Sequence, residues 1–147
     1  MLRFSSKVER ILRSSGWFPG RQVDIEPWKA SLVSFEWHDE AESFLREFGG
    51  IKVEVSGPGI STAREPFEID PELAMGEEGR FAELSDKFRR RFFPIGDVGT
   101  GGEYFLALDE EGRLYILIGS WAYLLGGVSS GLEHLVTGVK AEEVPLP

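Results

Sequence analysis

The sequence contains no cysteine, and this absence removes several kinds of chemistry. Without thiols the chain has neither a disulfide framework nor a thiolate metal site, and a Cys–His nucleophile pair is excluded. Histidine is nearly as scarce, because the sequence holds only His38 and His134, which fit no metal-binding spacing such as H-E-x-x-H. We therefore expect no catalytic residue, no metal site and no cofactor.

Long hydrophobic runs are also missing. No run approaches the roughly 18 apolar residues of a membrane span, and the start Met1–Ser5 lacks the apolar stretch of a signal peptide. We therefore expect a cytoplasmic protein without a membrane partner. The 147 residues, 41% of them hydrophobic, are typical of one globular domain. We predict a single domain over 1–147 in which residues 139–147, polar and limited by proline, form a loose C-terminal tail.

Basic residues are fewer than acidic ones. The sequence has 16 Lys and Arg residues and 25 Asp and Glu residues, so its formal net charge is −9. Such a surface repels nucleic acid and attracts basic partners. We therefore expect no nucleic-acid partner. An acidic surface also keeps a protein in solution, so the charge by itself leaves both interpretations open. The one basic cluster, Lys87 and Arg89 to Arg91, suits the C-terminus of a helix.

A predicted hairpin organises the rest of the chain. Tyr104–Leu108 and Arg113–Ile118 are almost continuously apolar, as expected for strands covered on both faces. Between them, Asp109 suits the start of a tight turn and Gly112 can take the left-handed conformation that closes it. Trp121–Leu125 follows as a third strand. Residues 92–96 lead into the hairpin, and residues 97–102 are predicted to be a loop.

The remaining segments are predicted to cover or extend this sheet. Alternation over 51–56 predicts a strand, and residues 65–70 predict a short one, whose proline indicates either a sheet edge or the start of the strand. Apolar spacing predicts helices after a Ser6 cap, over most of 27–48 and within 71–91. A closing helix is expected to start at a cap formed by Ser129 or Ser130.

Motifs that would carry catalysis are absent from the sequence. There is no G-x-S-x-G elbow, and the glycine-rich stretch 96–102 matches neither a phosphate-binding loop nor a dinucleotide fingerprint. Adjacent acids such as Asp39-Glu40 and Glu77-Glu78 point apart at turns and helix starts, where water solvates them, whereas glycosidase chemistry needs two carboxyls facing across a cleft. The residues therefore do not support an enzyme.

Four short motifs, taken in order, are similar to those of one protein family. They are Gly16-Trp17-Phe18-Pro19-Gly20-Arg21, then Ala41-x-x-Phe44-Leu45-x-x-Phe48-Gly49-Gly50, then Phe93-Pro94-Ile95-Gly96, then Asp109-x-x-Gly112-Arg113-x-Tyr115. Over about residues 8–138 the chain resembles the SUKH superfamily, particularly its third immunity-protein subgroup. The resemblance implies an α+β fold, in which helices pack around a central, mostly antiparallel sheet.

The resemblance also implies a function. Proteins of this kind are bacterial antidotes that bind a cognate polymorphic toxin, often a nuclease, and neutralise it in the producing cell's cytoplasm. The matching residues are implied to be framework rather than catalytic residues: Trp17, Arg21, Phe44, Gly49, Pro94, Gly96, Gly112 and Tyr115. Two alternatives stay open, namely a regulatory protein-interaction scaffold of the same fold and a small hydrolase that uses carboxylates. The sequence leaves the oligomeric state open.

An acidic antidote can imitate the phosphates that a nuclease binds and can speed association by long-range attraction. We therefore expect acids near the hairpin rim to meet a basic toxin, and exposed aromatics to anchor the centre of the interface. The predicted partner-binding residues are Asp97, Glu103, Asp109, Glu110, Glu111, Trp121 and Tyr123. The competing interpretation of each acid is an ordinary solvated turn residue.

Overall fold

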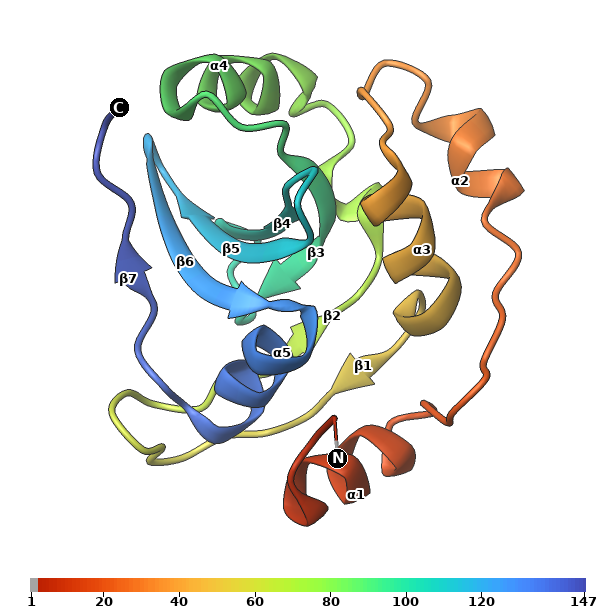
Figure 1. Ribbon diagram of the computed structural model, residues 1–147, viewed down its shortest axis with the longest axis vertical. Helices are drawn as coiled ribbons and strands as arrows, with labels where there is room; N and C mark the ends of the chain where they lie inside the picture. The colour runs from red at the N-terminus through yellow and green to blue at the C-terminus, as the bar shows by residue number, and fades with distance from the viewer. Residues whose placement is uncertain (1–2) are drawn as a thin grey trace.

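The sheet is an antiparallel meander in which each strand pairs with the next one in the sequence. The computed structural model describes residues 3–147, and within them the strands form one seven-stranded sheet in the order β1 to β7. The strands are β1 (Lys52–Val53), β2 (Phe67–Glu68), β3 (Phe93–Val98), β4 (Tyr104–Leu108), β5 (Arg113–Ile118), β6 (Trp121–Gly127) and β7 (Glu142–Glu143). The α+β fold with a mostly antiparallel sheet is thus confirmed, and Figure 1 shows how strongly the sheet curves.

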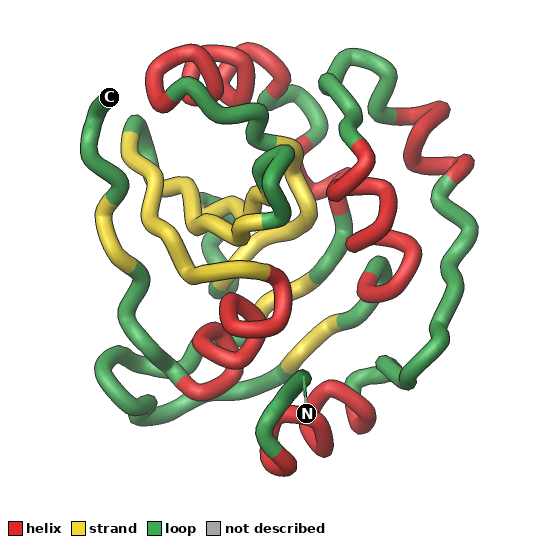
Figure 2. The backbone as a smooth tube through the Cα atoms, in the orientation of Figure 1, coloured by secondary structure: helices red, strands yellow, loops and turns green. Residues whose placement is uncertain are grey.

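The helices lie around this curved sheet (Figure 2). They are α1 (Ser6–Ser14), α2 (Glu26–Ser31), α3 (Asp39–Phe48), the 3-10 turn η1 (Pro71–Ala74), α4 (Glu78–Phe88) and α5 (Val128–Thr137). No helix within residues 3–147 is long and apolar enough to cross a bilayer.

Opposite faces of the central sheet bury side chains against different helices. Leu114 packs so closely on α5 that a Cβ on Gly131 would lie 3.0 Å from its side chain. On the other face the Phe105 ring meets the Phe81 ring of α4 at 5.8 Å between centroids. Residues that alternate along β4 and β5 therefore all find apolar partners, which explains their continuous hydrophobicity. The buried side chains of both faces belong to one core.

The predicted hairpin has the expected bounds. Tyr104 pairs with Ile118 and Leu108 pairs with Leu114, so the turn spans residues 109–112. Gly112 adopts φ +80°, the left-handed conformation that closes the turn. The third strand also forms, and it runs to Gly127 rather than ending at Leu125.

Three predicted boundaries were wrong. The cap of α1 is Ser5, whose Oγ accepts from the Val8 amide, and not Ser6. The helix α5 begins at Val128 after Gly127, so that Ser129 and Ser130 lie inside it and cap nothing. Asp97 and Val98 belong to β3 and not to a loop, since they pair with Phe105 and Tyr104.

The proline before Phe67 marks the start of a strand, which was one of the two explanations offered for it. The other explanation is wrong, because β2 is not an edge: Val53 pairs with Phe67 on one side and Val98 on the other. Both sides of the strand at Phe67 are therefore occupied by cross-strand pairing within the chain. The segment that we expected to be a loose tail adds a strand, in which Glu142 and Glu143 pair with β6.

Several residues of the four motifs have structural roles. A Cβ on Gly96 would overlap the carbonyl oxygen of Glu68, so only glycine lets β2 and β3 approach this closely. The Trp17 ring is buried and stacks on Phe48, with centroids 6.2 Å apart. Arg21 donates to the carbonyl of Glu47, 2.7 Å away, near the end of α3. These contacts agree with framework roles.

Candidate partner-binding surface

The Asp109 side chain lies inside the hairpin turn and offers nothing to a partner. The residue is 0% exposed. Its Oδ1 accepts from the backbone amides of Glu111 and Arg113, both at 2.9 Å, while Oδ2 accepts from Arg113 Nε at 3.0 Å. The Tyr115 hydroxyl donates to Oδ2 at 2.6 Å. The carboxylate therefore stabilises the turn, and we leave Asp109 out of the candidate surface.

Burial and hydrogen bonding act in opposite directions on the pKa of this carboxyl. Burial alone raises the pKa of Asp109, but the hydrogen bonds from Tyr115, from the backbone and side chain of Arg113 and from the Glu111 amide outweigh it and hold the pKa below its ordinary value. Burial and the same hydrogen bond raise the pKa of the Tyr115 phenol. The pair is therefore a carboxylate with a neutral phenol at neutral pH.

The two other acids of the turn differ from one another. Glu110 is half-buried, and both of its carboxylate oxygens accept from the Arg91 amide at 3.2 Å. Glu111 is exposed, and its carboxylate lies 3.2 Å from Arg113 Nη2. Surface pairs of this kind contribute little and leave the charge open to water. Glu111 is thus the acid of this turn that is most available to a partner.

Asp97 lies in the middle of a cross-strand row and not at the hairpin rim. Its neighbours across the strands are Glu68 on β2 and, one strand further, Lys52 on β1. Burial raises the pKa of Asp97, and the charges of Glu68 and Asp70 raise it further, while Lys52 opposes them. Three carboxylates, those of Asp97, Glu68 and Asp70, therefore share this part of the surface with one amine.

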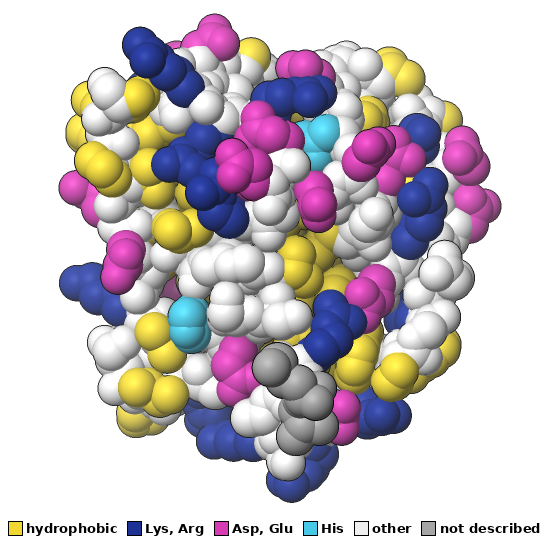
Figure 3. Space-filling model, viewed as in Figure 1, with side chains coloured by type: hydrophobic (Ala, Val, Ile, Leu, Met, Phe, Trp, Pro, Cys, Tyr) yellow, Lys and Arg dark blue, Asp and Glu magenta, His cyan; other side chains and the backbone are white. Residues whose placement is uncertain are grey.

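The predicted residues consequently form two groups rather than one patch. Glu103 precedes β4, and Asp109 to Glu111 follow it, so that the whole strand of roughly 17 Å separates them. Figure 3 shows acidic side chains interspersed with Lys and Arg over the face in view, not gathered in one area. Of the two groups, the end where β4 starts has the predicted aromatics, because Tyr104 pairs with Ile118 and Ile118 pairs with Trp121.

Trp121 stands at the tip of the β5–β6 hairpin and is 44% exposed. Lys87 of α4 covers part of its ring, with Nζ 4.2 Å from the centroid, and donates to the Ser120 carbonyl at 2.7 Å. Tyr123 is half-buried two residues further along the strand. The two aromatics are therefore accessible, and Trp121 is held in place by an amine on its ring.

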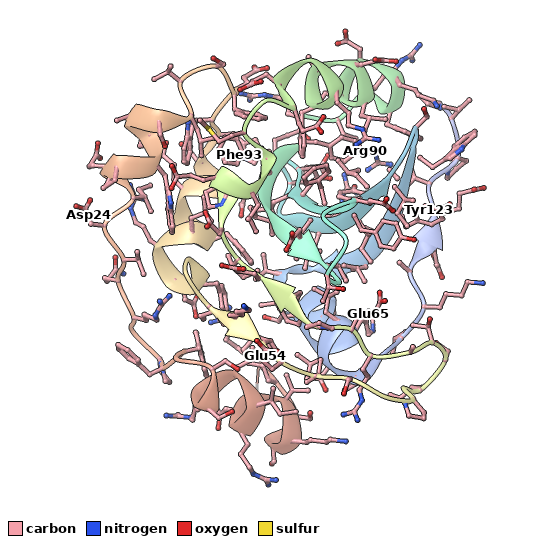
Figure 4. The ribbon with its side chains drawn as sticks, turned by 180° about the vertical axis from the view of Figure 1, so that it is seen from behind. Asp24, Glu54, Glu65, Arg90, Phe93 and Tyr123 are labelled. Carbon is pink, nitrogen blue, oxygen red and sulfur yellow. The ribbon has the colours of Figure 1, made fainter. Side chains whose placement is uncertain are left out.

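A groove beside Tyr123 is the feature that the sequence did not predict. It has a volume of 330 Å³, and its lining includes Tyr104, Tyr123, Glu65 and Lys140. Its segments are far apart in the chain, and its apolar residues resemble core residues in the sequence, so no local pattern pointed to it. Figure 4 shows Tyr123 on β6 and Glu65 on the loop before β2 at the same side of the molecule.

Both histidines are hydrogen-bonded to the backbone. His38 caps α3, since Nδ1 accepts from the Ala41 amide at 3.2 Å while Nε2 faces the carbonyls of Arg91 and Leu108. His134 Nδ1 donates to the Leu125 carbonyl at 2.6 Å. Within residues 3–147 no three His, Asp or Glu side chains converge as metal ligands.

Comparison with known proteins supplies the family. The family model of the SUKH-3 immunity protein matches residues 4–138. The chain belongs to the SUKH-3 immunity protein family. No curated protein and no solved structure matches it. The match spans α1 to α5 and confirms the resemblance that the four motifs indicated.

In this SUKH-3 immunity protein the basic cluster serves the fold. Arg90 Nη1 donates to the Tyr115 hydroxyl at 2.7 Å, and Arg91 Nη2 lies 3.1 Å from a Glu36 carboxylate oxygen. Arg89 ends α4 in the left-handed conformation, with φ +54°. The arginines therefore hold the link between α4 and β3 in place, and the cluster lies at the C-terminus of a helix as predicted.

Proposed function

We propose that this protein neutralises a cognate toxin by binding to it and covering its working surface, without catalysis of its own. The observation that carries the proposal is the match of the SUKH-3 immunity protein family to residues 4–138. The net charge of −9 suits a basic toxin such as a nuclease, whose phosphate-binding groups the acids would occupy. Such a complex would form in the cytoplasm of the cell that makes the toxin.

We place the contact at the end of the sheet where β4 starts. Glu103 is exposed there, and the accessible Trp121 lies at the same end of the sheet, two strands away. An exposed carboxylate and an exposed aromatic at one end of a sheet are expected of a hot spot facing a basic partner. Asp97 lies on the neighbouring strand and would add attraction at longer range, while Glu110 and Glu111 would lie outside the central contact.

The experiment is a co-purification and neutralisation test with the product of the neighbouring toxin gene. Cells that express the toxin domain should survive only when this protein is also present, and the two chains should elute as one complex. The double variant Glu103→Lys with Trp121→Ala should lose at least about tenfold in affinity, as hot-spot residues do. Glu111→Lys at the other end of β4 is the matched charge-reversal control and should bind normally.

Two results would reject the proposal. A locus with no effector gene, together with no protection against any candidate toxin, would indicate a regulatory scaffold of the same fold. Protection that persists without a stable complex, or turnover of a substrate by the purified protein, would show that binding is not the mechanism. If the complex forms but Glu111→Lys weakens it more than the double variant does, the contact lies at the opposite end of β4.

A further inference from the structure

The groove beside Tyr123 lies between the sheet, the C-terminal end of α5 and the loop that precedes β2. Its floor is aliphatic, and its volume is 330 Å³, at the small end of the about 300–1,000 Å³ of ligand pockets. The apolar floor residues are Val98, Ile116, Ile118, Leu125, Leu135 and Val139. A cavity of this size and lining suits one long side chain better than a large ligand.

The wall opposite the sheet is fixed before any partner arrives. The amides of Ile60 and Ser61 donate to the carbonyls of Thr137 and Gly138 at 3.0 and 2.9 Å. The Lys140 amide donates to Ser61 Oγ at 2.8 Å. A Cβ on Gly59 would lie 2.6 Å from the Gly138 Cα, so the loop rests directly on the end of α5. Binding therefore costs little ordering of this wall.

The groove is lined by two tyrosines and Glu65, and two further acids, Glu103 and Glu143, are neighbours of those tyrosines. Tyr104 is 37% exposed, and Tyr123 is half-buried. Glu65 lines the groove, while Glu143 pairs with Tyr123 across β6 and β7. None of the ion pairs formed among residues 3–147 uses Glu65, Glu103 or Glu143. These acids therefore remain open to an external cation.

A lysine and a histidine, which are not acidic, also face the groove. Lys140 lines it, and the His134 ring lies at the α5 end with its Nδ1 bonded to Leu125. Lys140 would repel a cation that comes near it. Of the charged side chains in the lining, Glu65 is the one that would attract an incoming positive charge.

We propose that this groove receives an arginine side chain of the partner. The methylene stem would lie on the aliphatic floor, as the stems of long basic side chains do on apolar surfaces. The guanidinium would stack on a tyrosine ring and meet the Glu65 carboxylate, and guanidinium is hydrated weakly enough to leave water for such a site. The chain already pairs its own Arg90 with the Tyr115 ring, 5.6 Å away. This inference rests on the proposed function.

The test uses amino-acid probes, so it needs no toxin. N-acetyl-arginine methylamide is titrated into the full chain while the methyl resonances of Ile116, Ile118 and Val139 are followed by NMR. We expect saturable shifts, with the neutral isostere N-acetyl-citrulline methylamide binding about two- to fivefold more weakly, as the loss of an exposed cation–π contact predicts. Glu65→Gln should weaken the arginine probe alone, and Tyr123→Ala should weaken both.

Glu72→Gln is the matched control, because Glu72 is exposed, forms no ion pair within residues 3–147 and lies outside the groove. Should Tyr123→Ala fail to fold, Glu65→Gln, an exposed change, still decides. Equal binding of arginine and citrulline probes, or tighter binding of N-acetyl-norleucine methylamide, would overturn the proposal in favour of a purely apolar anchor. Concentration-dependent shifts without any probe would overturn it in favour of a second copy of this chain.

The outcomes separate this inference from the proposed function. If the toxin complex forms and Glu65→Gln and Tyr123→Ala leave its affinity unchanged, the groove inference fails while the immunity function stands. If no toxin binds but the arginine probe binds as expected, the immunity function fails and the groove remains a site for a basic side chain of another partner.

Discussion

The Tyr115 hydroxyl joins two charged side chains, because it donates to Asp109 Oδ2 at 2.6 Å and accepts from Arg90 Nη1 at 2.7 Å. Through this one oxygen the turn before β5 is connected to the segment that follows α4. The Arg90 Nη1 and Asp109 Oδ2 atoms themselves lie 3.8 Å apart. The central hairpin is thereby fixed relative to the helix that covers it.

Replacing Tyr115 with Phe should therefore destabilise the protein by about 1–3 kcal/mol, since a buried acceptor and a donor both lose their partner. Urea unfolding followed by tryptophan fluorescence measures the loss. Tyr123→Phe is the control, because Tyr123 forms no hydrogen bond through its hydroxyl within residues 3–147 and should change stability by less than about 0.5 kcal/mol. Equal losses in the two variants would show that the hydroxyl of Tyr115 has no structural role.

Asp109 should make the stability of the protein fall as the pH is lowered into the acidic range. Its pKa is lower in the folded protein than the about 3.9 of an unfolded chain, so its contribution is present above that value and is lost as the pH falls through the lower folded value. Asp109→Asn should cost about 3 kcal/mol at neutral pH and flatten the decline below about pH 4. Unfolding free energies from pH 2 to 7 test this, with the exposed Glu111→Gln as control. An unchanged acid slope would contradict it.

Asp97, in contrast, should lower the stability of the protein at neutral pH. Its pKa is raised in the folded state by burial and then by Glu68 and Asp70, so its charged form opposes folding once the pH exceeds the unfolded value. Asp97→Asn should stabilise the protein at neutral pH, by less than about 1 kcal/mol because water screens a half-buried group. Thermal unfolding at pH 7 and at pH 3 measures the gain, which should vanish at pH 3. A loss of stability at pH 7 would show that the carboxylate makes a favourable contact.

Gly96→Ala should separate β2 from β3. The added methyl group would overlap the Glu68 carbonyl, and backbone cannot give way as a flexible side chain does. We expect a loss of about 3 kcal/mol or more and fast amide exchange at Glu68. Gly101→Ala is the matched control, since its nearest heavy atom would be Glu103 Cγ at 3.9 Å. Similar stability of the two variants would contradict the close approach.

Association with the toxin should depend on salt. Because the protein has a net charge of −9, raising the ionic strength from about 0.05 to 0.5 M should lower the association rate about tenfold and leave the dissociation rate nearly unchanged. Stopped-flow tryptophan fluorescence reports both rates. Glu103→Gln should reduce the salt slope, whereas Lys7→Gln, which removes an exposed base, should increase it slightly. A rate independent of salt would argue against a basic toxin surface.

The sequence by itself determined the parts of the fold that depend on neighbours along the chain. The arms 104–108 and 113–118, the turn with Gly112 and the third strand follow from hydrophobic run length and turn chemistry. The four motifs, Gly96 among them, likewise led to the family that the comparison found. The cap Ser5 was missed by one position, because adjacent serines offer equivalent groups to the same amide, and α5 begins after Gly127 without any side-chain cap.

Only the tertiary structure decided which side chains reach the surface. Asp109 and Glu111 stand in the same turn and carry the same charge, yet one is buried by Tyr115 and Arg113 while the other faces water. The groove brings Glu65, Tyr123 and Lys140 together from segments that no local pattern connects. Exposure depends on what packs against a residue from elsewhere in the chain, and a single sequence records that only indirectly.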